Sequence, residues 1–536
     1  MPTFKIDGRE IPFEKGETVI QAAHRAGIDI PHYCWHPGLS IAANCRMCLV
    51  EVMPPPGRPA MMLNVLAYDP QTGHYVDQQK PKLQPACQQM VTEGLEIKSE
   101  SSPHVEKARS AVQEFLLLNH PVDCPICDQA GECRLQDYWL EHQGTSKRMR
   151  DEPVHKPKAE VFGPTIVYDA ERCIVCTRCV RFSEEVALDP VLSVRERGNV
   201  NEIVVSPGRE LDHDYTLMTE HVCPVGALTS KDFRFKARVW FLRSVRGVCQ
   251  ECAGGCNSYI DYDPRNNTVY RHRPRENMEV NKYWMCDQGM LDYRRVHEDR
   301  LLDAKIGGET VKVGTALDRA AELLRGVDPS KLAVLLSGQH SLEDNFAVLE
   351  LAQKQLGITQ VFATGRPPGK ADKILKHADK NSNTAGVLAL LAPRKPLNFA
   401  ALASAIQSGA VTHVLAIGSG IEDPALAPAL AKLKALVVIG TWNGPLSHSA
   451  HVALPASSWA EADGLFINAK GMTQESEQAI EPLGQSRSAW KLAAAIGVRL
   501  GAPVPYRSLE ELRLALSGGG ASNPKSKRPV ASGAAQ

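Results

Sequence analysis

Residues 31–52 have the sequence PHYCWHPGLSIAANCRMCLVEV, and their three cysteines belong to the first of four groups of candidate metal ligands. Together with Cys87 they give the spacing C-x10-C-x2-C-x38-C. Upstream, residues 3–6 and 11–13 predict two strands joined by a turn at Asp7 and Gly8. A helix is expected to open at Thr18, where the residues fit a capping box.

A hairpin, a helix and then a cysteine-rich loop follow one another in a β-grasp domain that holds a [2Fe–2S] cluster. Plant-type ferredoxins use the spacing C-x4-C-x2-C, and the first gap in this chain is longer. A structural zinc site is the alternative, because thiolates also bind zinc. The candidate ligands of this first group are Cys34, Cys45, Cys48 and Cys87.

The cysteine count separates metal sites from other uses of cysteine. All 15 cysteines of the 536 residues lie between Cys34 and Cys286. The odd number, and an N-terminus without a secretory signal, argue against a disulfide framework.

Lys+Arg and Asp+Glu are both 61, and this zero net charge argues against nucleic-acid binding. No apolar run approaches the roughly 18 residues of a membrane helix, so no membrane span is expected.

The second group lies in the string NHPVDCPICDQAGEC, which follows a predicted helix over residues 105–118. It offers only three cysteines, so a histidine is expected as the fourth ligand. Imidazole can replace thiolate on iron, where it raises the reduction potential. Three cysteines and one histidine also bind zinc, which leaves this group ambiguous by itself. Its residues are His120, Cys124, Cys127 and Cys133.

The third group begins with C-x2-C-x2-C and ends at a distant cysteine followed by proline. Two-cluster bacterial ferredoxins contain two such triplets, each followed by a Cys-Pro pair. The cysteine of each Cys-Pro pair is the fourth ligand of the other cluster. The four positions expected for a second cubane hold Ser183, His213, Thr216 and Thr219. His213 is interpreted as a surface or packed histidine, with a coincidental metal ligand as the alternative. The pattern therefore indicates a ferredoxin domain reduced to one [4Fe–4S] cluster, with the ligands Cys173, Cys176, Cys179 and Cys223.

The fourth group has the spacing C-x2-C-x3-C-x29-C, which suits a [4Fe–4S] cluster or zinc. Its residues are Cys249, Cys252, Cys256 and Cys286. Fifteen cysteines and His120 make sixteen ligands, or four groups of four with no thiol left over. We therefore expect one [2Fe–2S] and three [4Fe–4S] clusters, with iron bound through these same residues.

Three strings of this chain resemble a known family. The strings PHYCWHPGLSIAANCRMCLVEV, HPVDCPICDQAGEC and CIVCTRC…CPVGAL are similar to the large iron–sulfur subunit of respiratory NADH–quinone oxidoreductase, complex I. The resemblance covers about residues 1–300. Residues 51–85 are longer than is usual in that family and predict an inserted hairpin. The fourth group resembles the N-terminal iron–sulfur segment of molybdopterin oxidoreductases.

The resemblance implies an electron-transferring subunit with no catalytic residue of its own. A partner flavin subunit would oxidise NADH, and electrons would pass from the first group to the third, then to the second, and on toward quinone. The implied partners are the flavin subunit and other peripheral-arm subunits, at the cytoplasmic face of the inner membrane. The alternatives are a subunit of an NAD-linked formate dehydrogenase or iron-only hydrogenase, and a zinc-held assembly scaffold.

The C-terminal half alternates strand and helix signals, which predict a doubly wound α/β domain. Buried strands are expected at residues 332–336, 361–363, 413–417 and 435–439. Residues 452–474 resemble a molybdopterin-oxidoreductase string. No molybdopterin is expected, because no cysteine follows Cys286 and Gln288 replaces the lysine that relays electrons in that family.

The chain is thus predicted to be a multidomain α+β and α/β protein. The predicted order is a β-grasp [2Fe–2S] domain, a helical [4Fe–4S] domain with one histidine and three cysteines, a reduced ferredoxin domain, a molybdopterin-oxidoreductase-type [4Fe–4S] segment, an α/β domain and a disordered tail. Their predicted limits are 1–100, 101–145, 146–241, 242–298, 299–516 and 517–536.

Overall fold

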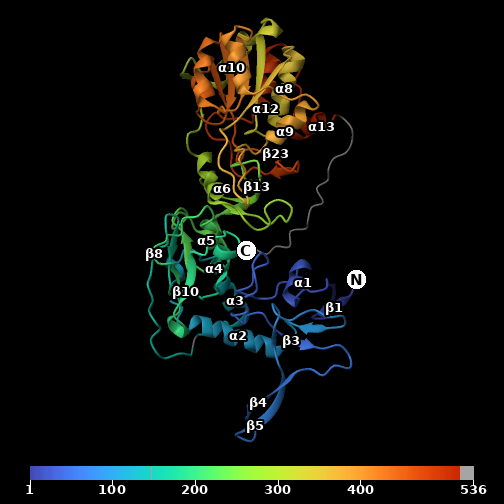
Figure 1. Cartoon of the computed structure of the whole chain (residues 1–536), viewed down its shortest axis with the longest axis vertical. Helices are drawn as coiled ribbons and strands as arrows, with labels where there is room; N and C mark the ends of the chain where they lie inside the picture. The colour runs from blue at the N-terminus through green and yellow to red at the C-terminus, as the bar shows by residue number, and fades with distance from the viewer. Residues whose placement is uncertain (147, 519–536) are drawn as a thin grey trace. The chain divides into compact units, whose positions relative to one another are not determined.

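The computed structural model describes residues 1–146 and 148–518, and these divide into two compact units (Figure 1). The first unit is Met1–Trp240, and the second begins at Phe241. The predicted tail at 517–536 lies outside the described residues, except for its first two positions. In the described part of the chain, no helix is long and apolar enough to cross a membrane.

The first unit begins with a five-stranded sheet in the order β2-β1-β7-β3-β6. β1 pairs antiparallel with β2 across the turn at Asp7 and Gly8, and it pairs parallel with β7. Phe4, Ile11 and Ile20 form part of the core between this sheet and α1. The bounds are β1 Thr3–Ile6, β2 Arg9–Pro12, α1 Val19–Arg25, β3 Leu49–Met53, β6 Gln84–Pro85 and β7 Glu96–Lys98.

A two-stranded ribbon, β4 Met62–Asp69 and β5 His74–Pro81, projects from this sheet (Figure 1). Its strands pair only with each other among the described residues. Leu66 and Tyr75 are each 70% exposed. The hairpin predicted within residues 51–85 is therefore present, as β4 and β5.

The rest of the first unit consists of short helices and small sheets around the cysteine loops. Helix α2 contacts both α3 and β3. One small sheet has the order β12-β9-β8, and β10 pairs with β11. The bounds are α2 Pro103–Leu117, α3 Arg134–His142, β8 Glu160–Val161, β9 Ile166–Tyr168, α4 Arg178–Glu185, β10 Leu192–Arg195, β11 Glu202–Val205, α5 Leu217–His221 and β12 Leu228–Ser230.

The second unit opens with a three-stranded antiparallel sheet, β13-β14-β15, that carries the fourth ligand group beside it. The group's last cysteine caps the short helix α6. The hairpin β23–β24 contacts this region through β13 and β24. The bounds are β13 Arg243–Val248, β14 Asn257–Asp263, β15 Thr268–Pro274, α6 Asp287–Leu291, β23 Gly464–Ile467 and β24 Thr473–Ser476.

A seven-stranded sheet, in the order β17-β16-β22-β21-β20-β18-β19, forms the centre of the second unit. The strands from β22 to β19 run parallel, and β16 and β17 add an antiparallel edge. Leu332 and Val334 of β18 face a core with α7, α8 and α12, whereas Ala333 and Leu335 face α10. Both faces are buried, as is usual for parallel sheets. The bounds are β16 Ala304–Ile306, β17 Glu309–Val311, α7 Val313–Leu324, β18 Leu332–Ser337, α8 Leu342–Glu350, β19 Gln360–Thr364, α9 Thr384–Leu391, α10 Phe399–Gln407, β20 His413–Ile417, β21 Ala435–Gly440, α11 Pro445–His448, β22 Val452–Pro455, α12 Ala489–Arg499 and α13 Leu509–Leu516.

Candidate metal centres

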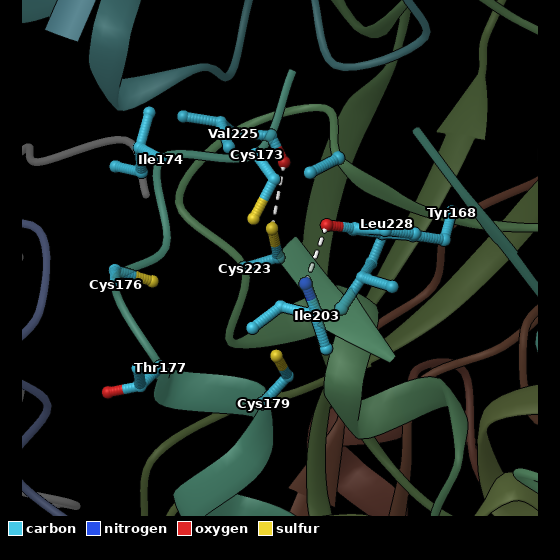
Figure 2. Close-up of a pocket in the computed structure, with 11 residues that line it drawn as sticks. Tyr168, Cys173, Ile174, Cys176, Thr177, Cys179, Ile203, Cys223, Val225 and Leu228 are labelled. Atoms are coloured by element: carbon cyan, nitrogen blue, oxygen red, sulfur yellow. Dashed lines mark hydrogen bonds between the residues drawn. The ribbon is translucent and has the colours of Figure 1, made fainter. Parts of the chain in front are cut away.

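The third ligand group surrounds one enclosed cavity (Figure 2). Cys173 and Cys176 lie on the loop before α4, Cys179 on α4, and Cys223 just after α5. Figure 2 shows their sulfur atoms directed toward a common space, whose walls include Ile174, Ile203 and Leu228. Burial raises the pKa of the Cys173, Cys176 and Cys223 thiols to about 11. Burial thus disfavours the thiolate form of these side chains. Four thiolates in this space would need a positive charge between them, and iron would supply it.

The backbone of the cysteine loops is held in an uncommon conformation. Non-glycine residues with positive φ occur at Val175 (50°) and Thr177 (63°) in the third group's loop. Ala43 (53°) and Arg46 (61°) have the same feature in the first group's loop. When residues with right-handed and left-handed backbone conformations alternate, successive N–H groups point into one concave surface. Many Fe–S sites use this geometry. The Val175 amide donates to Cys173 Sγ at 3.3 Å, so these loops fit a cluster with anionic sulfur.

The first ligand group is buried against the N-terminal sheet. Cys34 and Cys48 are each 1% exposed and Cys87 is fully buried. The thiol of Cys45 donates to the sulfur of Cys34 and lowers the pKa of Cys34, against the effect of burial. Hydrogen bonding to Cys87 and burial raise the pKa of Cys48. Cys34 therefore has Cys45 as a neighbour, and Cys48 has Cys87.

The second ligand group combines three neighbouring thiols with a buried imidazole. Burial raises the pKa of Cys133 to about 12, and Cys127 and Cys124 lie close enough to raise it further. His120 Nδ1 is buried and lacks a hydrogen-bond partner among the described residues. Burial lowers the pKa of His120 to about 4, which leaves a neutral imidazole able to bind metal.

The fourth ligand group lies in the second unit, where its cysteines are between 3% and 6% exposed. Burial raises the pKa of Cys286 to about 12, and the Gly289 amide donates to its sulfur at 3.4 Å. A Cβ atom on Gly289 would lie 2.9 Å from Cys249 Sγ. Glycine is therefore required where α6 approaches the thiols. Cys249 also lies close enough to Cys252, Cys256 and Cys286 for their charges to raise its pKa.

Among the described residues, no set of three or more His, Cys, Asp or Glu side chains is arranged to hold a single metal ion. An iron–sulfur cluster suits thiols that are spaced more widely than the ligands of a single ion, because its irons and sulfides occupy the space between them. The donor type, the apolar walls and the amide donors of the third group fit a cluster of this kind.

The positions of the missing second cubane are occupied by protein hydrogen bonds. Ser183 Oγ donates to the carbonyl of Asp189 at 2.7 Å, and Thr219 Oγ1 donates to the carbonyl of Thr216 at 2.7 Å. His213 is half-buried, and its Nδ1 accepts a hydrogen bond from the Tyr215 amide at 3.1 Å. His213 is thus partly packed against the protein, within the predicted alternatives of a surface or a packed histidine.

Arginines that donate to the backbone carbonyls of the ligand loops were not predicted from the sequence. Arg238 donates to the carbonyl of Cys127 at 2.7 Å. Arg366 donates to the carbonyls of Gln250 and Glu251, each at 2.7 Å. The only sequence signal is arginine beside a ligand cysteine, as in TRCVR at 177–181. The arginines with such contacts are Arg109, Arg178, Arg181, Arg238 and Arg366.

Four family models match the chain. They are described as a 2Fe-2S iron-sulfur cluster binding domain (residues 1–102), an NADH-ubiquinone oxidoreductase-G iron-sulfur binding region (109–148), a NADH-quinone oxidoreductase subunit 3 ferredoxin-like domain (163–229) and a molybdopterin oxidoreductase (329–499). The chain is thus a multidomain protein with ferredoxin-like, [4Fe–4S] and molybdopterin-oxidoreductase-like regions.

Curated relatives carry names from the same family. The G subunit of NADH-quinone oxidoreductase from Streptomyces coelicolor is 34% identical over 67% of this chain and 40% of its own length. The Rickettsia conorii protein of the same name is 36% identical over 66% of this chain and 49% of its own length. The mitochondrial NADH dehydrogenase [ubiquinone] iron-sulfur protein 1 of Solanum tuberosum is 36% identical over 67% of this chain and 45% of its own length.

These matches span less than half the length of each of those relatives. A solved NAD+-reducing [NiFe]-hydrogenase matches with 28% identity and a TM-score of 0.36, over 44% of this chain and 91% of that one. The predicted resemblance to the large iron–sulfur subunit is confirmed by the curated relatives.

Proposed function

We propose that this chain, whose relatives are G subunits of NADH-quinone oxidoreductase, is the electron-transferring iron–sulfur subunit of such an enzyme. The observation that carries the proposal is the order of four ligand groups, whose thiols are mostly buried and, in the third group, line one small cavity. The relatives' names favour this function over the formate dehydrogenase and hydrogenase alternatives. Iron–sulfur clusters bound by these groups would accept and release single electrons.

The sixteen residues predicted from spacing are the proposed ligands, with His120 as the one imidazole. The protein around them has three tasks: to exclude water, to direct amide donors at sulfur, and to set the distances between the groups. The Val175 and Gly289 amides support the second task, since each donates to a ligand sulfur.

Contacts within the first unit support the proposed sequence of groups: first, third, second. Asn44, next to Cys45, donates to the carbonyl of Val175 at 3.2 Å and so joins the first loop to the third. A Cβ atom on Gly226 would lie 2.3 Å from Cys127 Sγ, so the third group's Cys-Pro segment approaches the second group closely. The Arg134 amide, next to Cys133, donates to the carbonyl of Pro224 at 3.1 Å.

The finer assignments are also proposals. They are the β-grasp domain, the helical domain with one histidine and three cysteines and the reduced ferredoxin domain, with the limits given above, and a doubly wound C-terminal domain without molybdopterin. The proposed partners are a flavin subunit and other subunits of a peripheral arm, at the cytoplasmic face of the inner membrane. The α/β region has no cysteine after Cys286 to bind molybdenum, which supports the absence of that cofactor.

Metal analysis of the anaerobically purified chain tests the proposal. One binuclear and three tetranuclear clusters predict about 14 irons and as many labile sulfides per chain. The protein should be brown, with the broad visible absorption of iron–sulfur proteins. A colourless protein that contains zinc would contradict the proposal, and molybdenum near one atom per chain would contradict the assignment of the C-terminal domain.

A further inference from the structure

One face of helix α4 is directed at the loop of the first ligand group, although α4 itself carries a ligand of the third. Arg178, Arg181 and Glu185 have the spacing i, i+3, i+7, which places them on one side of the helix. Glu185 accepts from the Ser40 amide at 2.8 Å and also from the Ser40 hydroxyl. All three side chains bind residues between Cys34 and Ser40, more than 140 positions earlier.

Arg181 contacts both ligand groups with one guanidinium. Its Nη2 donates to the carbonyl of Cys34 at 2.6 Å and to the carbonyl of Cys176 at 3.3 Å. Its Nη1 donates to the carbonyl of Ser40. Arg178 adds a parallel connection, to the carbonyl of Trp35 at 2.5 Å and to that of Val222 at 3.2 Å. Trp35 follows Cys34, and Val222 precedes Cys223.

These two guanidinium groups are buried without a carboxylate. Arg178 is 8% exposed and Arg181 is 9% exposed. Within residues 1–146 and 148–518, neither forms an ion pair with Asp or Glu. A buried cation is unfavourable unless negative charge lies nearby. Glu185 shares Ser40 with Arg181 but forms no ion pair with it among the described residues, whereas the contacts to the carbonyls of Cys34 and Cys176 place Arg181 beside a candidate ligand of each group.

We propose that Arg181, supported by Arg178, is a positioning residue that fixes the first and third ligand groups against each other and stabilises electrons on both. The proposal rests on the proposed function. Each cluster gains one negative charge when it is reduced. A buried cation beside both groups therefore favours the reduced state of both, and its removal lowers both reduction potentials.

Arg238 offers a matched control in the same unit. It binds the carbonyls of Pro125 and Cys127, which belong to the second group alone. Arg181→Gln and Arg238→Gln remove the same charge and the same kind of contact from different groups. The conservative variant Arg181→Lys keeps the charge, but its single ammonium cannot reproduce the planar fork that binds several carbonyls.

Redox titration monitored by electron paramagnetic resonance, on the full chain with its clusters, tests the inference. Arg181→Gln should shift the first and third groups to lower potentials and leave the second and fourth unchanged. Arg238→Gln should shift only the second group. Arg181→Lys should keep the potentials near wild type while a chelator removes iron from the first and third groups faster.

The possible failures are distinguishable. If Arg181→Gln retains both clusters at unchanged potentials, or shifts only one of them, the inference is wrong. If Arg181→Gln loses the clusters, Arg181→Lys decides: wild-type potentials support the inference and lowered potentials overturn it. If the wild-type chain gives no iron–sulfur signals, the proposed function itself fails, whatever the variants do.

Discussion

At the scale of single residues, Asp261 shows how the second unit compensates a buried charge. Asp261 is 1% exposed and lies in the middle of the β13-β14-β15 sheet, with Ser244 and Arg271 as its register partners. Arg271 Nε and Arg273 Nε each donate to it at 2.5 Å, and Ser244 Oγ donates at 2.6 Å. Burial acts to raise the pKa of Asp261, but the two arginines outweigh burial and hold the pKa well below its usual range.

Asp261→Asn should destabilise the second unit by about 3–5 kcal/mol, because it removes the buried carboxylate that pairs with both Arg271 and Arg273. The apparent unfolding midpoint of the full chain in denaturant measures this effect. Asp318→Asn is the control, since its carboxylate is 70% exposed beside Arg499 and should matter little. Equal midpoints for the two variants would contradict the prediction.

The pH dependence of the same residue has a definite sign. A carboxylate with a depressed pKa stabilises the folded state at pH values above its unfolded pKa of about 3.9. That contribution is lost as the pH falls from there toward the folded pKa. Asp261→Asn should therefore remove part of the acid sensitivity below about pH 4.

The candidate ligands are visible in the sequence as a pattern of thiols, whereas the arginines that bind their loops are not. Most of the sixteen candidate donors lie close to another donor in the sequence, and thiols are uncommon enough for such spacings to be specific. Arg181 binds carbonyls that every residue possesses, and one of its partners is 147 positions away. No pattern of residue types in the sequence predicts such a contact.

At the scale of elements, most regular segments agree with local physical rules. Ser341 caps α8 by accepting from the Asp344 amide at 3.1 Å, and Gly357, with φ of 62°, follows this helical stretch, as predicted. The strand predicted at 413–417 has the same bounds as β20. The strand predicted at 11–13 instead begins at Arg9, because the tight turn lets Arg9 pair with Ile6.

The β4–β5 ribbon should be dispensable for the first ligand group. The path to Cys87 is set by β3 and β6, where Leu49 pairs with Pro85 and Val50 with Gln84. Replacing residues 58–82 with a short glycine-containing turn should therefore leave the iron content and the [2Fe–2S] spectrum unchanged. A selective loss of that spectrum would show that the ribbon holds the ligand loop. Shortening residues 88–95, which lead into β7, is the control expected to damage the site.

At the scale of the whole molecule, the ligand groups are divided between two compact units. Three groups lie in Met1–Trp240, and the fourth lies beyond Phe241. The fourth group connects Cys249 with Cys286 across β14 and β15 and packs beside Gly289. Metal binding at that group is thus expected to stabilise its own unit, whereas the first three groups share one folded body.

This division predicts different consequences for two cysteine substitutions. In the proposed enzyme, Cys179→Ser interrupts the main sequence of groups and should abolish NADH–quinone activity in the assembled complex. Cys286→Ser should lower the stability of the second unit or the yield of assembled complex, while assembled enzyme keeps near-normal activity. Activity must be normalised to assembled complex. An assembled Cys286→Ser enzyme as inactive as Cys179→Ser would place the fourth group on the main route.

Ribosomes make the chain from its N-terminus, so Cys34 is synthesised 147 residues before Arg181. At about 5–20 residues per second, Cys34 waits about 7–30 s for the helix that binds its loop. The third group has a shorter interval, because Arg178 of the same helix is separated from its partner Val222, next to Cys223, by only 44 positions. Thiols that stay open longer are exposed longer to oxidants. During oxidative stress, newly made chains are therefore expected to lose the first group before the third.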